Sequence, residues 1–218
     1  MKNFFYLCIL ILAFTNCKPK EPQVPTVYDF GKVNKEESSY YNKFFDFKIF
    51  FNPAWHIDNS LKKNDIIINS LPKNLGGGES LPEGQVAAYR VKTAHLLHVT
   101  KYEKLKHKGL NPYILIMADN QTKFSNPEIK TTLEYVKYSK DFIKKLAPNS
   151  KSEPIRDVVI NGKQFKLLRT IINLGESGKV YQECYSIKKN DFFLNLIFSH
   201  QDEKDKYEFN EIIKHIKI

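Results

Sequence analysis

Residues 157–199 read DVVINGKQFKLLRTIINLGESGKVYQECYSIKKNDFFLNLIFS, and this stretch decides the fold. Its four apolar runs are rich in β-branched and aromatic residues and are separated by short polar segments, which is typical of consecutive strands. Asn161-Gly162 separates the first two runs, and this pair is the strongest short hairpin signal. Strands joined by short turns pair antiparallel. The stretch therefore predicts a four-stranded antiparallel meander, with strands at 157–160, 164–173, 179–187 and 191–199.

Two amphipathic patterns flank this meander and predict helices. Thr131 and Glu134 form a capping box at the start of a predicted helix over residues 131–146, and its apolar stripe consists of Val136, Phe142, Ile143 and Leu146. A last helix is predicted over residues 203–216, with Asp202 as its cap and an apolar face made of Phe209, Ile212, Ile213 and Ile216. Such helices must bury their stripes on the sheet, so the predicted fold class is α+β, an antiparallel sheet with helices packed on it.

Residues upstream of the helices contribute further predicted strands. The segment 43–51 alternates between apolar and polar residues and predicts a half-buried strand that Asn52-Pro53 ends. Trp55 follows on the turn, where we expect it to pack in the core. Three more strands are predicted over 66–68, 85–100 and 113–118, and residues 74–84, with Gly76-Gly77-Gly78, predict a loop.

The first sixteen residues have the pattern of an export signal. Lys2 is followed by an apolar run from Phe4 to Phe14, which is too short to span a bilayer but fits the apolar region of a signal peptide. Cys17 stands where the polar sequence begins. Residues 17–39 are rich in Pro, Lys and Glu and predict a flexible tether, and residues 40–218 form the predicted domain.

Cys17 in this position resembles the lipobox of bacterial lipoproteins. In that family the cysteine thiol receives a diacylglyceryl group, the chain is cut just before it, and the new amine is commonly acylated, as with palmitate. Phe14 and Asn16 stand where the family usually has Leu and a small residue, and this departure is similar to the relaxed lipoboxes of spirochaetes and Bacteroidetes. The alternatives are an uncleaved N-terminal anchor and a secreted protein without lipid.

The charge pattern limits the expected partners, and the cysteine content limits the possible disulfides. The net charge is +10, and it becomes +9 without residues 1–16, which carry Lys2 alone. The lysines are interleaved with Glu and Asp and form no basic block, so we expect no nucleic-acid partner. The three cysteines are Cys8, Cys17 and Cys184, which leaves no disulfide within the domain if Cys17 is lipidated. We expect Cys184 to be a small buried apolar residue.

Candidate catalytic and metal-binding residues are few. His95 and His98, with His107 nearby, could bind zinc if they lay on a helix, but on a regular strand they would point to opposite faces. We predict a strand here, so no metal and no cofactor are assigned. The other histidines are isolated in sequence and are expected to be exposed: His56, His200 and His215. Asp202, Glu203 and Asp205 are interpreted as complementing a helix N-terminus.

The domain resembles the PsbP-like superfamily, which includes photosynthetic lumenal proteins and many bacterial lipoproteins. The resemblance rests on residues 41–49, on Asn52-Pro53-Ala54-Trp55, on the predicted helix at 131–146 and on residues 159–165, followed by two strands and a last helix. It implies the PsbP-like fold over residues 40–218. It implies no functional residue, because nothing outside the framework matches a known ligand-binding motif.

These observations favour a non-enzymatic binding or assembly factor, held by a lipid anchor to the cell membrane or outer membrane. The domain would lie in the periplasm or at the cell surface and meet an envelope protein through the open sheet face or through residues 71–84. One alternative is an envelope hydrolase whose site the sequence does not reveal, since no catalytic motif occurs. Another is a metal-binding module that uses His95 and His98.

Overall fold

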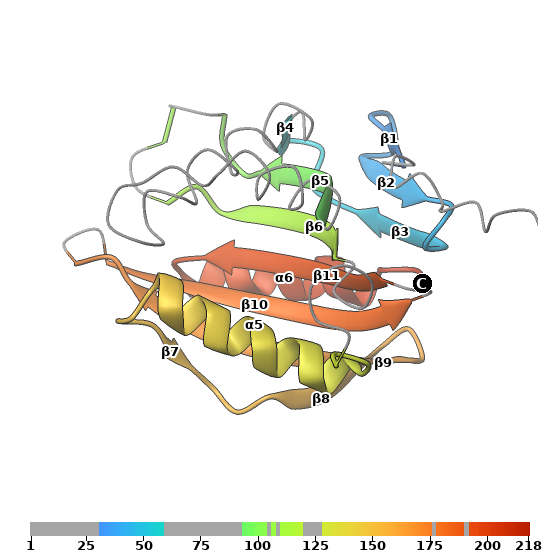
Figure 1. Ribbon diagram of the computed structural model, residues 1–218. Coiled ribbons are helices and arrows are strands. Elements are labelled where there is room, and N and C mark those ends of the chain that lie inside the picture. Colours follow the sequence, from blue (N-terminus) through green and yellow to red (C-terminus); the bar gives the residue numbers. More distant parts are fainter. Residues whose placement is uncertain are drawn as a thin grey trace, which may run out of the picture.

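The computed structural model describes residues 31–58, 93–103, 106–107, 110–119, 128–175, 178–189 and 192–218. The predicted signal sequence, Cys17, the predicted strand at 66–68 and the segment 71–84 lie outside these ranges. The described residues form two antiparallel sheets and two helices (Figure 1). None of the described helices is both long enough and apolar enough to cross a bilayer.

The larger sheet has eight strands, and all of its pairings are antiparallel. They are β4 (His56–Asp58), β5 (Thr93–Thr100), β6 (Tyr113–Asp119), β7 (Lys151–Ser152), β8 (Arg156–Ile160), β9 (Lys163–Asn173), β10 (Lys179–Lys189) and β11 (Phe192–His200). Their order is β4-β5-β6-β11-β10-β9-β7, and β8 also pairs with β9. The predicted meander over residues 157–199 is therefore confirmed as β8 to β11, and the α+β class is confirmed with it.

The turn between β8 and β9 has the geometry that its sequence predicts. Asn161 has φ +44° and Gly162 has φ +74°, so both central residues are left-handed. This is the backbone of a type I′ turn, whose twist matches that of the two flanking strands. Asn and Gly adopt this conformation at low cost because Asn tolerates it and Gly has no Cβ. The dipeptide thereby fixes the register of the hairpin.

A smaller sheet begins nearer the N-terminus than the sequence predicted. It consists of β1 (Lys32–Asn34), β2 (Ser39–Asn42) and β3 (Phe47–Phe50), paired antiparallel in this order. A Cβ added to Gly31 would lie 2.5 Å from the carbonyl oxygen of Tyr41, so the chain is already packed closely at residue 31. Residues 32–39, which we assigned to the tether, therefore belong to this sheet.

The strand predicted over residues 43–51 is confirmed only at residues 47–50, which form β3, because a turn occupies residues 43–46. The Asn42 side chain accepts a hydrogen bond from the Phe45 amide at 3.1 Å, and Asp46 has φ +43°. These features close a turn over residues 43–46 between β2 and β3. The apolar alternation extended the predicted strand too far because the side chain of Phe45 in the turn is buried, as are those of Phe47 and Ile49 in the strand.

Two helices cover opposite faces of the eight-stranded sheet (Figure 1). Helix α5 (Thr132–Leu146) has the predicted capping box of Thr131 and Glu134, and it packs on β9 and β10. Helix α6 (Glu203–Lys214) has the predicted Asp202 cap and packs on β11 and β3. The predicted end of α6 at residue 216 is two residues too late. Ile216 follows the helix but is still buried, at 1% exposure. The apolar pattern that predicted the helix therefore continues past its end.

The main core lies between the larger sheet, the smaller sheet and α6. Its fully buried side chains include Phe47, Phe165, Phe198 and Phe209. A second, smaller core lies on the other face, where α5 places Tyr135 and Val136 against Leu168 and Phe193; in it Tyr135 stacks on Phe193 with 4.3 Å between the ring centroids. The small sheet and α6 thus share one face of the larger sheet, and α5 has the opposite face.

Candidate functional site

One candidate site among the described residues is a groove of about 1200 Å³. It lies between β3 with its following turn, the second half of α6 and the C-terminal tail. Its apolar lining consists of Tyr41, Phe50, Phe51, Pro53, Ile212, Ile216 and Ile218. Concave, largely apolar surfaces with a few polar groups are the usual shape of binding sites. The groove is therefore the first candidate for ligand binding.

Backbone groups of β3 also face this groove. The Phe51 amide donates to the Ser38 carbonyl at 2.9 Å. In an antiparallel pair the backbone N–H and C=O groups of every second residue point to the partner strand, and those of the residues between them point away from it. Lys48, an outward residue, exchanges two backbone hydrogen bonds with Lys217 of the C-terminal tail, at 2.8 and 2.9 Å. Phe50 is the next outward residue. Its amide and carbonyl therefore lie on the open edge that lines the groove.

Two cations lie over the ring of Phe50 at this edge. The Lys48 Nζ is 4.7 Å from the ring centroid, and the Lys217 Nζ is 5.8 Å from it. Lys48 also forms an ion pair with Glu37 at 2.8 Å. An aromatic ring with two ammonium groups close to it is a mixed apolar and cationic surface. It can contact both an apolar side chain and a carboxylate.

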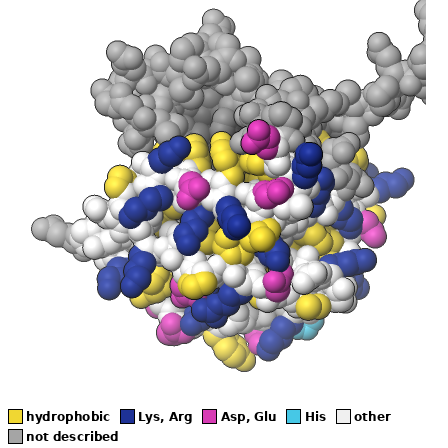
Figure 2. All heavy atoms as spheres, turned by 60° about the horizontal axis from the view of Figure 1, so that its bottom comes forward, with side chains coloured by type: hydrophobic (Ala, Val, Ile, Leu, Met, Phe, Trp, Pro, Cys, Tyr) yellow, Lys and Arg dark blue, Asp and Glu magenta, His cyan; other side chains and the backbone are white. Residues whose placement is uncertain are grey.

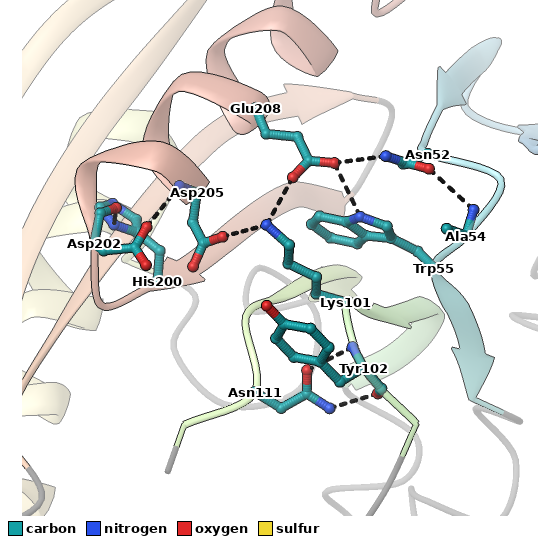
Figure 3. Close-up of polar contacts among 10 residues, drawn as sticks. All are labelled: Asn52, Ala54, Trp55, Lys101, Tyr102, Asn111, His200, Asp202, Asp205 and Glu208. Atoms are coloured by element: carbon teal, nitrogen blue, oxygen red, sulfur yellow. Dashed lines mark hydrogen bonds and ion pairs between the residues drawn. The ribbon is translucent and has the colours of Figure 1, made fainter. Parts of the chain in front are cut away.

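A network of polar side chains (Figure 3) adjoins the groove and shares Asn52 and Glu208 with its lining. Lys101 follows β5, and its Nζ lies 2.6 Å from Asp205 Oδ1 and 3.0 Å from Glu208 Oε2, both on α6. The other oxygen of Glu208 accepts hydrogen bonds from Asn52 Nδ2 at 2.9 Å and from Trp55 Nε1 at 3.0 Å. The network joins three chain segments and holds α6 against the turn that follows β3.

Trp55 packs in the core, as its position on the turn predicted. It is 6% exposed, and its ring lies edge-on to Phe209 with centroids 5.5 Å apart. Asp205, by contrast, does more than complement the start of α6. It is 5% exposed and pairs with Lys101, which lies about a hundred positions earlier in the chain. No local pattern in the sequence could predict this pair.

Glu208 is expected to make the stability of the protein depend on acid pH. Burial raises the pKa of its carboxyl, but hydrogen bonds from Asn52, Lys101 and Trp55 and the Lys101 charge outweigh burial and lower this pKa overall. The stability that Glu208 contributes is therefore present above the unfolded carboxyl pKa of about 4.3 and is lost as the pH falls through the lower folded value. Glu208→Gln should lower the melting temperature by about 3 °C at pH 7 and by almost nothing near pH 3.

The measurement is thermal unfolding of both proteins at pH values between these limits. Glu211→Gln is the matched control on the same helix, since Glu211 is more exposed and pairs with Lys214. A difference between the wild type and Glu208→Gln that stays constant down to pH 3 would contradict this account.

His95 and His98 lie on a strand, as predicted, but the expectation that they point to opposite faces is wrong. A bulge shifts the register of β5 between His95 and Leu97. His95 then pairs with Met117 and His98 with Leu115, two residues that share one face of β6. The described residues contain no group of three His, Cys, Asp or Glu side chains that could hold a metal ion.

A chain of buried polar groups lies beneath α5. Asp119 accepts hydrogen bonds from Thr93 at 3.2 Å and from the Tyr135 hydroxyl at 3.3 Å. Asn195 donates to Tyr135 at 2.8 Å and accepts from Ser186 at 2.6 Å. Each of these groups has a partner inside the protein, so these hydrogen bonds help to hold α5 on the sheet.

Cys184 lies beside this chain and is partly buried. Its Sγ is 3.5 Å from the Ser186 hydroxyl, and its side chain packs against the core beneath α5. Burial raises the pKa of the Cys184 thiol to about 11. A thiol with a raised pKa is a poor nucleophile at neutral pH, so the interpretation of Cys184 as a packing residue stands.

A second, smaller pocket of about 130 Å³ lies beside the first half of β10. An ion pair of Arg169 Nε with Glu183 Oε1 at 2.8 Å lies in its lining, and Tyr185 donates to the same carboxylate at 2.6 Å. His200 also lines this pocket. It is 3% exposed and stacks on Tyr181, so the expectation that His200 is exposed is wrong. These charges are paired with one another and leave little room for a substrate.

No protein-family model matches this chain, and no curated protein matches it. Solved structures do match. Cyanobacterial PsbP (CyanoP) from Synechocystis sp. PCC 6803 is similar with a TM-score of 0.47 and 7% identity, over 83% of this chain and 91% of that chain. A Pseudomonas aeruginosa protein of unknown function, PA94, is similar with a TM-score of 0.39 and 12% identity, over 56% of this chain and 78% of that chain. The α+β class rests on the strand pairings of this chain itself.

Proposed function

We propose that the protein is a non-enzymatic binding or assembly factor of the cell envelope, built on a PsbP-like domain and held on a membrane by lipid at Cys17. The observation that supports a binding role is the groove beside β3, which combines an apolar lining with an open strand edge. The support for the lipid anchor is the sequence alone. The domain would stand in the periplasm or at the cell surface, on the inner or the outer membrane.

The groove fits an extended segment of a partner protein. Such a segment adds to an exposed strand edge by main-chain hydrogen bonds, and neighbouring pockets take its alternate side chains. Here the Phe50 amide and carbonyl offer the main-chain bonds, and Ile212 and Ile216 offer an apolar wall. Lys48 and Lys217 lie beside the Phe50 ring and would favour a carboxylate on the bound segment.

The two helices cover the sheet faces on which a partner was expected to bind. The sequence suggested the open sheet face or residues 71–84 as the contact. Because α5 and α6 cover opposite faces of the larger sheet, a fully open face is absent from the described part of the chain. The groove therefore replaces the open face in this proposal, and the segment 71–84 lies outside the described residues.

A metal-binding module remains the second candidate, because the β5 bulge brings His95 and His98 to one face. His98 Nδ1 also lies 3.9 Å from Asp58 Oδ2. Metal analysis of protein purified without an affinity tag decides this candidate, and one zinc per chain would favour it over the binding factor.

Site-specific crosslinking tests the binding role directly. A photoreactive phenylalanine analogue at Tyr41, which lines the groove and is 42% exposed, is expected to yield a discrete protein adduct in native envelope membranes. The same analogue at Tyr207 on α6, which is 68% exposed but outside the groove lining, should not yield it. Phe50→Asp should weaken the Tyr41 adduct roughly tenfold, as removal of a central interface aromatic does.

Thermal unfolding of the Phe50→Asp protein controls for its folding. Equal adducts from Tyr41 and Tyr207, or a Tyr41 adduct that Phe50→Asp leaves unchanged in a folded protein, would overturn the assignment of the groove.

A further inference from the structure

The positive charge of the described residues is concentrated in one part of the chain. Residues 128–175 carry ten Lys and Arg against five Asp and Glu, whereas residues 31–58 carry four of each. Figure 2 looks at the molecule from the side of α5 and β8, and Lys and Arg side chains outnumber Asp and Glu side chains on this face. A surface of one dominant sign attracts partners of the opposite sign.

The lysines of the two helices differ in whether they form ion pairs. On α6, Lys206 pairs with Glu203 and Lys214 with Glu211. On α5, four lysines lie at positions 137, 140, 144 and 145, and none of them forms an ion pair with a described residue. Lys144 instead donates to the backbone carbonyl of Ser150 at 3.2 Å. The four lysines of α5 outnumber its two acidic residues, Glu134 and Asp141, so the helix carries a net positive charge.

Apolar side chains are exposed among these lysines. Leu133 is 37% exposed and Tyr138 is 38% exposed, both on α5. The Tyr138 ring lies nearly parallel to that of Phe142, with 6.4 Å between the ring centroids. Exposed tyrosine is one of the side chains that protein interfaces favour.

We infer that the outward face of α5 is a docking surface for an acidic protein surface. This inference rests on the proposed function, since it names the chemistry of a partner for a membrane-held binding factor. The described chain begins beside the small sheet, on the face of the larger sheet opposite to α5 (Figure 1). The α5 face and the small sheet thus lie on opposite sides of the larger sheet.

Lysine acetylation of the full-length protein in neutral phosphatidylcholine vesicles tests this inference, with poly-L-glutamate as the acidic probe. The probe should slow acetylation of Lys137, Lys140 and Lys145 roughly tenfold, and 0.5 M salt should abolish the protection. Replacement of all four α5 lysines by Gln should weaken probe binding at least tenfold. The matched control changes four exposed lysines elsewhere by the same charge and should weaken it little: Lys32, Lys35, Lys179 and Lys204.

Three outcomes would overturn the inference. Equal loss of probe binding in both lysine variants would show a non-specific charge effect. Absence of protection would show that the probe does not bind α5. Protection by vesicles containing phosphatidylglycerol, without protection by poly-L-glutamate, would show that the face contacts a membrane. Sedimentation of the same protein with the neutral vesicles reports the lipid anchor independently, so failure of the anchor is seen separately.

Discussion

Replacement of Lys101 by methionine is expected to lower the free energy of unfolding by about 3 kcal/mol. The Lys101 side chain is 15% exposed, and the two carboxylates that it pairs with, Asp205 and Glu208, are 7% and 24% exposed. Burial lowers the pKa of Lys101, but the hydrogen bonds and charges of both carboxylates outweigh burial and raise it. Methionine keeps the length of the side chain and removes the charge, so two neighbouring carboxylates would remain without their cation.

Denaturant unfolding at pH 7 measures this loss, and Lys106→Met is the matched control. Lys106 is 71% exposed and pairs with Glu103, and an exposed pair of this kind contributes less than about 1 kcal/mol. In Lys101→Met, protonation of the carboxylates near pH 4 should recover part of the lost stability relative to the wild type. If Lys101→Met costs no more than Lys106→Met, the network of Lys101 does not hold α6 in place.

Replacement of Cys17 by serine is expected to release the protein from membranes. Each buried methylene of an acyl chain contributes about 0.8 kcal/mol, and one chain alone gives a membrane association constant on the order of 10⁴ M⁻¹. Loss of two or more chains should therefore lower the membrane-bound fraction from nearly all to a small part. Fractionation of cells that express each variant measures this change.

Cys8→Ser is the control for the cysteine replacement, because Cys8 lies in the same leader but before the expected cleavage point. It should leave the protein on the membrane. A Cys17→Ser protein that stays fully in the membrane with its leader uncleaved would identify the leader as an ordinary anchor.

Local signals in the sequence predicted much of the fold. Asn161-Gly162 fixed a hairpin because both residues accept positive φ, and Thr131 with Glu134 marked the start of α5 because the two cap each other. Both signals act within four residues. The turn at residues 43–46 was missed because the side chain of Phe45 keeps the alternation of a strand while its backbone leaves the sheet.

The candidate site depends on contacts that no local pattern contains. The groove is lined by β3, α6 and the C-terminal tail, which meet only in the folded chain. Lys101 and Glu208 are 107 positions apart, and neither residue is unusual in its own segment. The β5 bulge moved His95 and His98 to one face because a single extra residue reverses the alternation of a strand.

Mass spectrometry of the N-terminal peptide from purified membranes is the most direct test of the proposed lipid anchor at Cys17. We expect a peptide that begins at Cys17 and carries a diacylglyceryl group on its thiol, with a further acyl chain on its amine where acylation is complete. A peptide in which unmodified Cys17 is still preceded by Asn16 would contradict it.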